Sequence, residues 1–341
     1  MPVLPKKTIS AQYAQAHQRI FSCPVCGSSM KVVDQQRLTC ANGHSFDFAK
    51  QGYLNLLANP PKTKYDRKLF EARRHVMRVG KFFDPMLDVM AKVIAEHQGD
   101  ANGNETSGCS MAANLGDATS HNAILSDTAS HNAIANHNTA ARRTQSQVAP
   151  VTILDIGCGE GTHLDRICAK LDDQLLVPAV GVGMDISKEG ILEAAKYYGQ
   201  KIWCVADLAR PPFATGQFDA ILNILSPSNY TEFDRLLTPG GLLLKVVPQS
   251  GYLHELREFF YQNTDKESYS NDLTVERFGE FYAQVERHRV TYQVRFEEDM
   301  LRSLLLMTPL TWSVSQKEVE TFLEKAPATI TVDLELLVGQ K

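Results

Sequence analysis

Hydrophobic and polar positions follow two different periods in the second half of the chain. Residues 151–154 form a short apolar run rich in β-branched side chains, as expected for a buried strand. In residues 162–171 apolar side chains return every three or four positions, which predicts a helix. Between the two lie Gly157, Gly159 and Gly161. We therefore predict a strand, a tight glycine turn and a helix whose N-terminus can face a negatively charged group.

Further segments continue this order of strand and helix. The predicted strands are residues 177–184, 202–207, 217–225, the second part of 237–248, 290–296 and 329–338. The predicted helices that accompany them are residues 85–95 and 189–198. Strands that alternate with helices indicate an α/β fold with a parallel sheet.

Residues 98–149 have a different composition, dominated by Asn, Ser, Thr, Ala, Gly and His. The stretch Ser-His-Asn-Ala-Ile at 120–124 recurs at 130–134. Such low complexity predicts a disordered insertion. Its histidines could bind a metal, but their flexible spacing argues against it.

Length, composition and net charge limit the classes of protein to which the chain can belong. With 341 residues the chain is long enough for two domains. A hydrophobic content of 43% and a charged content of 22% fit an ordinary soluble globular protein. Because no apolar run could span a bilayer and the N-terminus lacks a signal-peptide core, we expect no membrane partner and a cytoplasmic location. The net charge of −4 gives no general argument for nucleic-acid binding.

Three cysteines and a histidine near the N-terminus have the spacing of a zinc site. The pattern is C-x2-C, thirteen residues, then C-x3-H, formed by Cys23, Cys26, Cys40 and His44. Three thiolates and one imidazole complete a tetrahedral zinc shell without an open position, so we predict a structural site. About forty residues bury little core, and the metal would supply folding energy. The alternative is chance clustering of cysteines.

The segment 62–81 is strongly basic. Eight of its twenty residues are Lys or Arg and two are acidic. Such a run is either a solvated helix face or a surface that neutralises phosphates. Beside a zinc module, we favour RNA contact.

Asp155 and the glycines after it form the pattern D-x-G-x-G-x-G, which differs from the dinucleotide fingerprint G-x-G-x-x-G. It resembles motif I of the class I S-adenosylmethionine methyltransferases, and the alternative is a generic α/β turn. The Pro-Gly-Gly turn at 239–241 also recurs in that class. The resemblance implies a Rossmann-like seven-stranded sheet in which 290–296 and 329–338 form the antiparallel end, with S-adenosylmethionine as cofactor.

Residues 44–57 carry a more specific resemblance. They read His-Ser-Phe-Asp-Phe-Ala-Lys-Gln-Gly-Tyr-Leu-Asn-Leu-Leu and follow the Cys-Pro-x-Cys block directly. This stretch resembles the RlmA-type 23S rRNA (guanine-N1-)-methyltransferases almost letter for letter. The Met-Thr-Pro stretch at 307–309 resembles the same family. The resemblance implies an enzyme that methylates N1 of a guanine in a hairpin of 23S rRNA, and it suggests a homodimer.

The resemblance assigns cofactor contacts residue by residue: Phe82, Asp155, Gly157, Gly159, His163, Leu164, Asp185, Asp207 and Tyr252. Several have plainer alternatives. Phe82 could be a core residue, and His163 and Leu164 fit a first helical turn. Asp185 could accept ribose hydroxyls or, like Ser187, cap the next helix. At Tyr252 the family usually has histidine.

We predict four parts: a zinc-binding domain at 1–60, a basic helical connector at 61–97, the insertion at 98–149 and the methyltransferase domain at 150–341. The zinc module and the basic connector would hold the RNA. Guanine N1 must lose a proton, but the sequence identifies no catalytic base. Asn223, Asp219 and Glu160 are candidates by position only, and Asp155 and Asp219 could simply anchor loops.

Two other functions share parts of this pattern. A small-molecule methyltransferase acting on quinones or metabolites would have the same cofactor core, but no use for a zinc module beside a basic segment. A non-catalytic RNA-binding protein would not need the intact glycine turn and Asp185. Cofactor binding separates the second alternative from an enzyme, and the identity of the methylated product separates the first. The sequence does not identify which guanine is modified.

Overall fold

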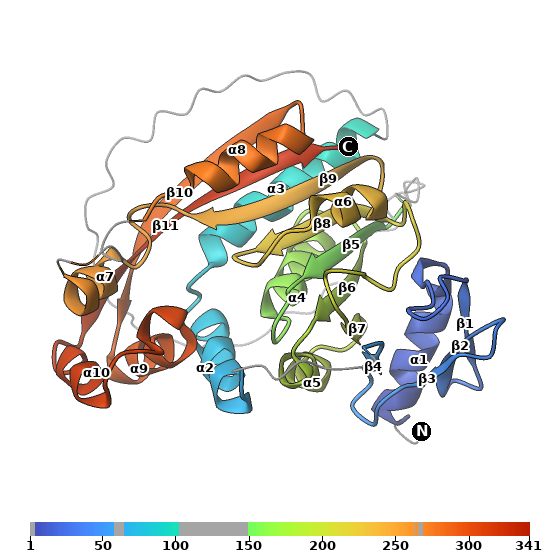
Figure 1. Cartoon of the computed structure of the whole chain (residues 1–341), viewed down its shortest axis with the longest axis horizontal. Helices are drawn as coiled ribbons and strands as arrows, with labels where there is room; N and C mark the ends of the chain where they lie inside the picture. The colour runs from blue at the N-terminus through green and yellow to red at the C-terminus, as the bar shows by residue number, and fades with distance from the viewer. Residues whose placement is uncertain (1–3, 58–64, 102–148, 263, 265–268) are drawn as a thin grey trace, which may run out of the picture.

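The computed structural model describes residues 4–57, 65–101, 149–262, 264 and 269–341 (Figure 1). Its large sheet has the order β10-β11-β9-β8-β5-β6-β7-β4, and a small sheet has the order β1-β2-β3. The strands are β1 Met30–Val33, β2 Arg37–Cys40, β3 Ser45–Asp47, β4 Leu54–Asn55, β5 Val151–Ile156, β6 Ala179–Asp185, β7 Ile202–Val205, β8 Phe218–Ile224, β9 Leu237–Pro248, β10 Val285–Phe296 and β11 Ala328–Gln340.

The middle of the large sheet is parallel from β9 to β7, and β11 and β10 are antiparallel. Strand β5 is buried along its whole length because helices cover both faces of the sheet. The glycine turn follows β5. Strand β5 pairs with β6, the next strand along the chain, on one side and with β8 on the other, so the strand order switches direction here. In open α/β sheets ligands bind at this switch point. The predicted fold class is confirmed.

The helices lie on both faces of the sheet and at its edges (Figure 1). In the described residues they are α1 Lys6–Ala16, α2 Arg67–Arg78, α3 Asp84–Ala101, α4 Thr162–Ala169, α5 Lys188–Tyr197, α6 Tyr230–Leu236, α7 His254–Tyr261, α8 Asp272–Phe281, α9 Glu298–Met307 and α10 Gln316–Leu323. None of them is long and apolar enough to cross a membrane.

The N-terminal module is joined to the large sheet, which therefore has one strand more than the seven predicted. Strand β4 pairs with β7 in parallel, with Leu54 opposite Cys204. Without β4, the strand β7 would present an unpaired edge. Phe21 and Phe213 form an additional bridge, and Phe21 belongs to one buried cluster with residues of the sheet. The zinc-binding block therefore shares its core with the sheet.

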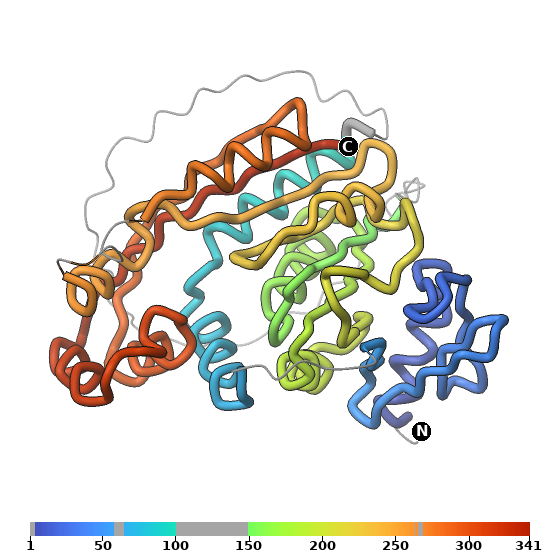
Figure 2. Tube along the Cα trace, viewed as in Figure 1, coloured from blue at the N-terminus to red at the C-terminus, as the bar shows by residue number. Residues whose placement is uncertain are grey.

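Figure 2 shows the N-terminal module at one end of the molecule and α9 and α10 at the other. The predicted insertion at 98–149 lies almost wholly outside the described residues. Of this insertion, residues 98–101 and residue 149 are described, and helix α3, predicted for 85–95, continues to Ala101. The four predicted domain boundaries stay predictions.

Candidate functional site

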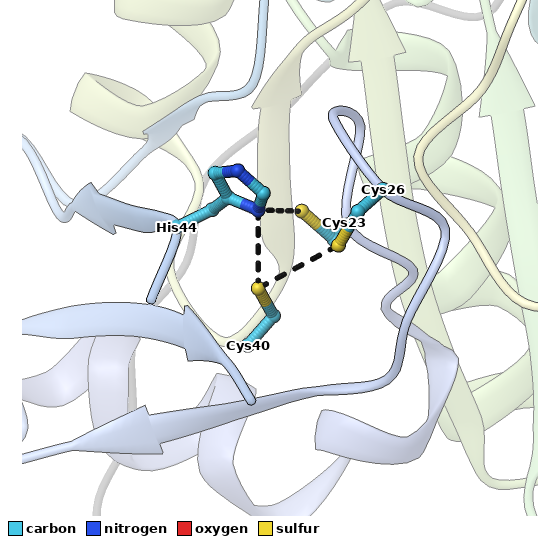
Figure 3. A group of neighbouring side chains, drawn as sticks. All are labelled: Cys23, Cys26, Cys40 and His44. Carbon is cyan, nitrogen blue, oxygen red and sulfur yellow. Dashed lines mark hydrogen bonds between the residues drawn. The ribbon is translucent and has the colours of Figure 1, made fainter. Parts of the chain in front are cut away.

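The predicted zinc ligands come together in the N-terminal module (Figure 3). The ligand atoms of Cys23, Cys26, Cys40 and His44 all lie within 4.8 Å of one another. Nδ1 of His44 is 3.6 Å from Sγ of Cys23 and 3.4 Å from Sγ of Cys40. Sγ of Cys26 is 3.8 Å from Sγ of Cys40. The spacing of the four residues in sequence thus becomes one cluster in space.

Two short turns produce this cluster. The amide of Gly27 donates to the carbonyl of Cys23 at 2.8 Å, and that of Gly43 donates to the carbonyl of Cys40 at 3.1 Å. Each turn therefore brings two of the four ligand residues toward the centre of the cluster.

The donor set fits zinc in chemistry and in size. Tetrahedral zinc, with bonds of about 2.3 Å to sulfur and 2.0 Å to nitrogen, separates its ligand atoms by roughly 3.5 to 3.8 Å. The three distances in the cluster are close to these values. Four protein ligands leave no position for water, so a zinc ion held here is structural.

The glycine turn after β5 forms the floor of a first cavity. Gly157 and Gly161 have φ values of +78° and +82°, in the left-handed region. A Cβ on Gly161 would lie 2.5 Å from the Trp203 ring, and one on Gly157 would lie 2.8 Å from Cβ of Ser226. Glycine is therefore required at both positions for conformation and for space.

The first cavity has a volume of about 640 Å³ and lies beyond the carboxyl ends of β5, β6, β7 and β8. Four predicted cofactor residues line it: Gly157, Gly159, Asp185 and Asp207. Asp207 also accepts a hydrogen bond from the amide of Ala209 at 2.9 Å, which fixes the loop after β7.

The structure assigns the cap of α5 to Ser187 and not to Asp185. Ser187 caps α5, because its hydroxyl accepts from the amide of Gly190. Asp185 instead accepts from the amides of Gly159, at 2.8 Å, and Ser187, at 2.7 Å, and it borders the first cavity. Burial raises the pKa of Asp185, while these two amides oppose the rise. Its carboxylate thus links the glycine turn to the end of β6.

Two buried acids, Asp155 and Glu160, and the half-buried Asp185 act electrostatically on one arginine, Arg73, behind the glycine turn. Glu160 is fully buried, and its Oε2 lies 2.8 Å from Nε of Arg73. Asp155 is 1% exposed, and its Oδ2 has no hydrogen-bond partner among the described residues. Burial raises the pKa of Asp155 to about 8, with Arg73 opposing the rise and Asp185 and Glu160 adding to it. A positively charged ligand would relieve this excess of acidic groups.

A second cavity of about 650 Å³ adjoins the first. The two share walls made by Tyr65, Phe70, Arg73, Leu225, Ser226 and Pro227. Tyr252, predicted as a cofactor contact, lines the second cavity only. Burial raises the pKa of its hydroxyl. Tyr252 therefore lies on the far side of the shared wall from the glycine turn.

Three predicted cofactor residues have side chains in the core. Phe82 is fully buried against Phe83 and Phe296, with ring centroids 5.2 and 5.4 Å away. His163 packs edge-on against Phe83, and burial lowers the pKa of His163 well below its ordinary value. Leu164 is also fully buried. None of the three side chains lines either cavity. Phe82 packs as a core residue, and His163 and Leu164 lie in the first turn of α4.

The three candidate bases also line neither cavity. Asp219 lies near the start of β8, at the opposite end from the cavities, and accepts from the amide of Thr152 at 2.8 Å. Asp219 thus ties the start of β8 to β5. Glu160 is paired with Arg73, and Asn223 is fully buried in a hydrogen-bonded network.

Three arginines of the basic segment have partners within the protein. Helix α2 packs against α5 and α9 rather than the zinc module (Figure 1). Arg74 lies over the Tyr197 ring at 3.8 Å, and Arg78 is 3.5 Å from Asp165. Arg73 pairs with Glu160. These arginines thus have partners inside the protein, and Lys62 and Lys64 lie outside the described residues.

Sequence reasoning missed several cavity residues. Tyr65, Phe70 and Arg73 line both cavities, although the charge of their segment pointed to RNA. The helical spacing of Phe70, Arg73 and Met77 was a usable signal. Lys245 lines the second cavity, and its signal was a single lysine within an otherwise apolar strand.

Comparisons with known proteins cover both parts of the chain. The family model described as RlmA, N-terminal, a zinc ribbon, matches residues 21–64, and a methyltransferase-domain model matches residues 153–241. A putative 23S rRNA (guanine-N(1)-)-methyltransferase, YxjB of Bacillus subtilis (strain 168), is 38% identical over 94% of this chain and 97% of its own length. The 23S rRNA (guanine(748)-N(1))-methyltransferase of Streptomyces fradiae is 27% identical over 93% of this chain and 94% of its own length.

Among solved structures, a putative methyltransferase from Bacillus halodurans C-125 covers 56% of this chain and 93% of its own. Its TM-score of 0.38 and identity of 15% are too low to support an inference. The assignment to a family therefore depends on the sequence relatives and the family models.

Proposed function

The chain belongs to the RlmA-type family of 23S rRNA (guanine-N1-)-methyltransferases, and we propose that it methylates N1 of one guanine in a hairpin of 23S rRNA with S-adenosylmethionine as methyl donor. The observation that supports this proposal is that one chain contains both a Cys3His cluster and a cavity beyond the glycine turn. The relative with 38% identity spans both parts.

The first cavity fits S-adenosylmethionine. Asp185 has the position of an acceptor for ribose hydroxyls at the end of β6, and Asp207 lines the cavity after β7. The bare backbone of Gly157 and Gly159 allows close approach. Asp155 and the other buried acids favour a ligand with positive charge. Bound there, the cofactor supplies a methyl group on a sulfonium, and the protein supplies orientation.

The second cavity is our proposed site for the guanine. Its wall shared with the first cavity includes Ser226 and Pro227, so a base bound there would lie next to the cofactor. Its lining includes Tyr252, Tyr261 and Tyr269, which offer aromatic surface to a flipped base. Guanine N1 lies on the Watson–Crick edge, so the base must be unpaired or flipped out of its stack.

The experiment that tests this function uses tritiated S-adenosylmethionine and unmodified large-subunit rRNA. Digestion of the product should give label in N1-methylguanine, and a reverse-transcription stop then identifies the position. Label in another nucleoside would contradict the assigned specificity. Label in extracted metabolites and not in RNA would favour the small-molecule alternative.

We propose that the zinc module holds the RNA through exposed lysines. Lys31 and Lys50 are exposed on this module. Replacing both with glutamine should weaken RNA binding and reduce the slope of log affinity against log salt by about 1.4 to 1.8, because about two phosphate contacts are lost. The measurement is fluorescence anisotropy with the rRNA hairpin at several salt concentrations.

A matched control removes two charges at the opposite end of the molecule. Lys317, in α10, and Lys325, just after it, are exposed, and α10 lies far from the zinc module (Figure 1). Replacing both with glutamine should leave the salt slope unchanged. Equal slopes of log affinity against log salt for the two double variants would show that the zinc module is not part of the RNA-binding surface. The homodimer and the cytoplasmic location stay predictions, and light scattering tests the first.

Cofactor binding should depend on pH through Asp155. With a pKa of about 8, Asp155 holds its proton below that pH in the free protein. The sulfonium favours the ionised carboxylate, so binding should release a proton. The ratio of S-adenosylmethionine to S-adenosylhomocysteine affinity should therefore rise roughly three- to tenfold from pH 6 to about pH 9, and level off above that pH. Titration calorimetry measures both affinities.

The comparison with S-adenosylhomocysteine isolates the sulfonium, because both molecules carry the same amino acid group. In Asp155→Asn the ratio should become independent of pH. A constant ratio in the unaltered protein would show that Asp155 does not respond to the charge of the cofactor.

A further inference from the structure

Lys245 is a buried cation beside the proposed guanine site. It lies in β9, is 4% exposed and lines the second cavity. Its Nζ is 2.7 Å from Oδ1 of Asn223, 2.7 Å from Oγ of Ser228 and 3.4 Å from the carbonyl oxygen of Ser226. Its partners among the described residues are neutral oxygens, and a buried cation without a carboxylate beside it is costly, so its presence needs an explanation.

The hydrogen bonds favour the charged form of this lysine. The hydroxyl of Ser228 donates to Oδ1 of Asn223 at 2.9 Å, so its oxygen is left to accept from Nζ. The carboxamide and carbonyl oxygens of Asn223 and Ser226 can only accept. All three partners therefore accept a proton from Nζ, and an ammonium group supplies three.

The same network holds the wall between the two cavities. Nδ2 of Asn223 donates to Oγ of Ser226 at 2.6 Å and to the carbonyl of Pro227 at 2.9 Å. Oγ of Ser226 donates to the carbonyl of Ile156, at the end of β5, at 2.9 Å. Lys245 is thus tied to the segment that would separate the cofactor from the base.

Other charged groups near Lys245 are already paired or lie around the cavity. On β11, which pairs with β9, Glu335 bonds to Arg287 and Asp333 bonds to Arg289. On β8 the facing residue is the neutral Asn223. The titratable groups that line the same cavity are Tyr65, Arg73, Arg257, Tyr252, Tyr261 and Tyr269. Burial lowers the pKa of Lys245 to about 8.

We propose that Lys245 supplies the positive charge that stabilises the guanine once N1 has lost its proton. This inference rests on the proposed function. The proton of N1 leaves to solvent, and N1 bonds the methyl carbon with the electron pair left behind. The sulfur keeps the pair of the broken carbon–sulfur bond, so the products are N1-methylguanine, a neutral thioether and one proton. A cation beside the base favours its anionic form at neutral pH.

The test compares single-turnover rates of the unaltered enzyme and Lys245→Met from pH 6 to 9.5, at saturating cofactor and RNA. The variant should be slower by roughly 100-fold at pH 6.5. The ratio of the unaltered enzyme's rate to the variant's rate should fall as pH rises. At high pH Lys245 loses its charge, and guanine loses its N1 proton without help from a cation. A ratio that rises through pH 8 would mean that the neutral amine acts as a base, and this would overturn the proposal.

Two further variants separate charge from structure. Ser228→Ala removes one of the three acceptors that favour the ammonium form, so the pKa of Lys245 should fall and the loss of rate should be larger at pH 8 than at pH 6.5. Lys245→Gln keeps one donor for Asn223 and removes the charge, and it serves if the methionine variant fails to bind S-adenosylhomocysteine. A ratio independent of pH for the charge-removing variants would mean that Lys245 only holds the loop. Absence of N1-methylguanine with the unaltered enzyme would instead refute the proposed function itself.

Discussion

Cys23→Ser is expected to remove zinc from the protein and to lower rRNA methylation more than 100-fold. Cys23 is a buried member of the Cys3His cluster. Zinc binding contributes about 10–16 kcal/mol to the folding of small zinc modules, more than a module of this size can replace by burying side chains. Elemental analysis measures the zinc content, and tritium transfer to rRNA measures the activity.

Cofactor affinity should largely survive in this variant. Most of the first cavity is built on β5, β6, β8 and the glycine turn, and the zinc module reaches the sheet at its edge, where β4 pairs with β7. We expect the affinity for S-adenosylhomocysteine to stay within roughly threefold. Cys168→Ser, at a buried cysteine outside the cluster, is the control and should keep its zinc. Parallel loss of cofactor binding in Cys23→Ser would show that the module and the sheet fold as one unit, as their shared core allows.

Asp185→Ala should weaken binding of S-adenosylmethionine by 100-fold or more. The substitution removes the acceptor for the proposed ribose contact and for the amides of Gly159 and Ser187. Hydrogen bonds to a charged group contribute about 1.5–3 kcal/mol each, and about 1.4 kcal/mol corresponds to tenfold in affinity. Titration calorimetry gives the affinity directly. Unchanged affinity would show that Asp185 makes no contact that contributes to cofactor binding.

Ser187→Ala is the matched control for Asp185. It removes the hydroxyl that caps α5 but keeps the amide that donates to Asp185. Loss of a helix cap costs about 1 kcal/mol, so the melting temperature should fall by a few degrees. Cofactor affinity should not change. The pair of variants thus separates the stability of α5 from the binding of the cofactor.

Local patterns in the sequence were sufficient for the fold and for the zinc cluster. The period of apolar residues predicted β5 and α4, and the glycines between them defined the turn. The spacing of Cys23, Cys26, Cys40 and His44 predicted a cluster that the structure contains. These features depend on neighbours within a few residues or on two short turns, which the chain encodes directly.

The direction of each side chain was not available from such patterns. Phe82, His163 and Leu164 follow family positions, yet their side chains pack into the core. The arginines of α2 look like an RNA surface in sequence, but Arg73 meets Glu160 across a large separation in the chain. A charge count cannot identify such a partner, because the partner is set by how α2 packs on the sheet.

By itself, the sequence determined the α/β core, the zinc ligands and the family resemblance, because periodicity and spacing are local. The tertiary structure alone decided which acids border a cavity, that β4 extends the large sheet, and that Lys245 is buried beside Asn223. Each of these depends on contacts between distant segments. Burial and pairing of charged groups arise only when those segments pack together.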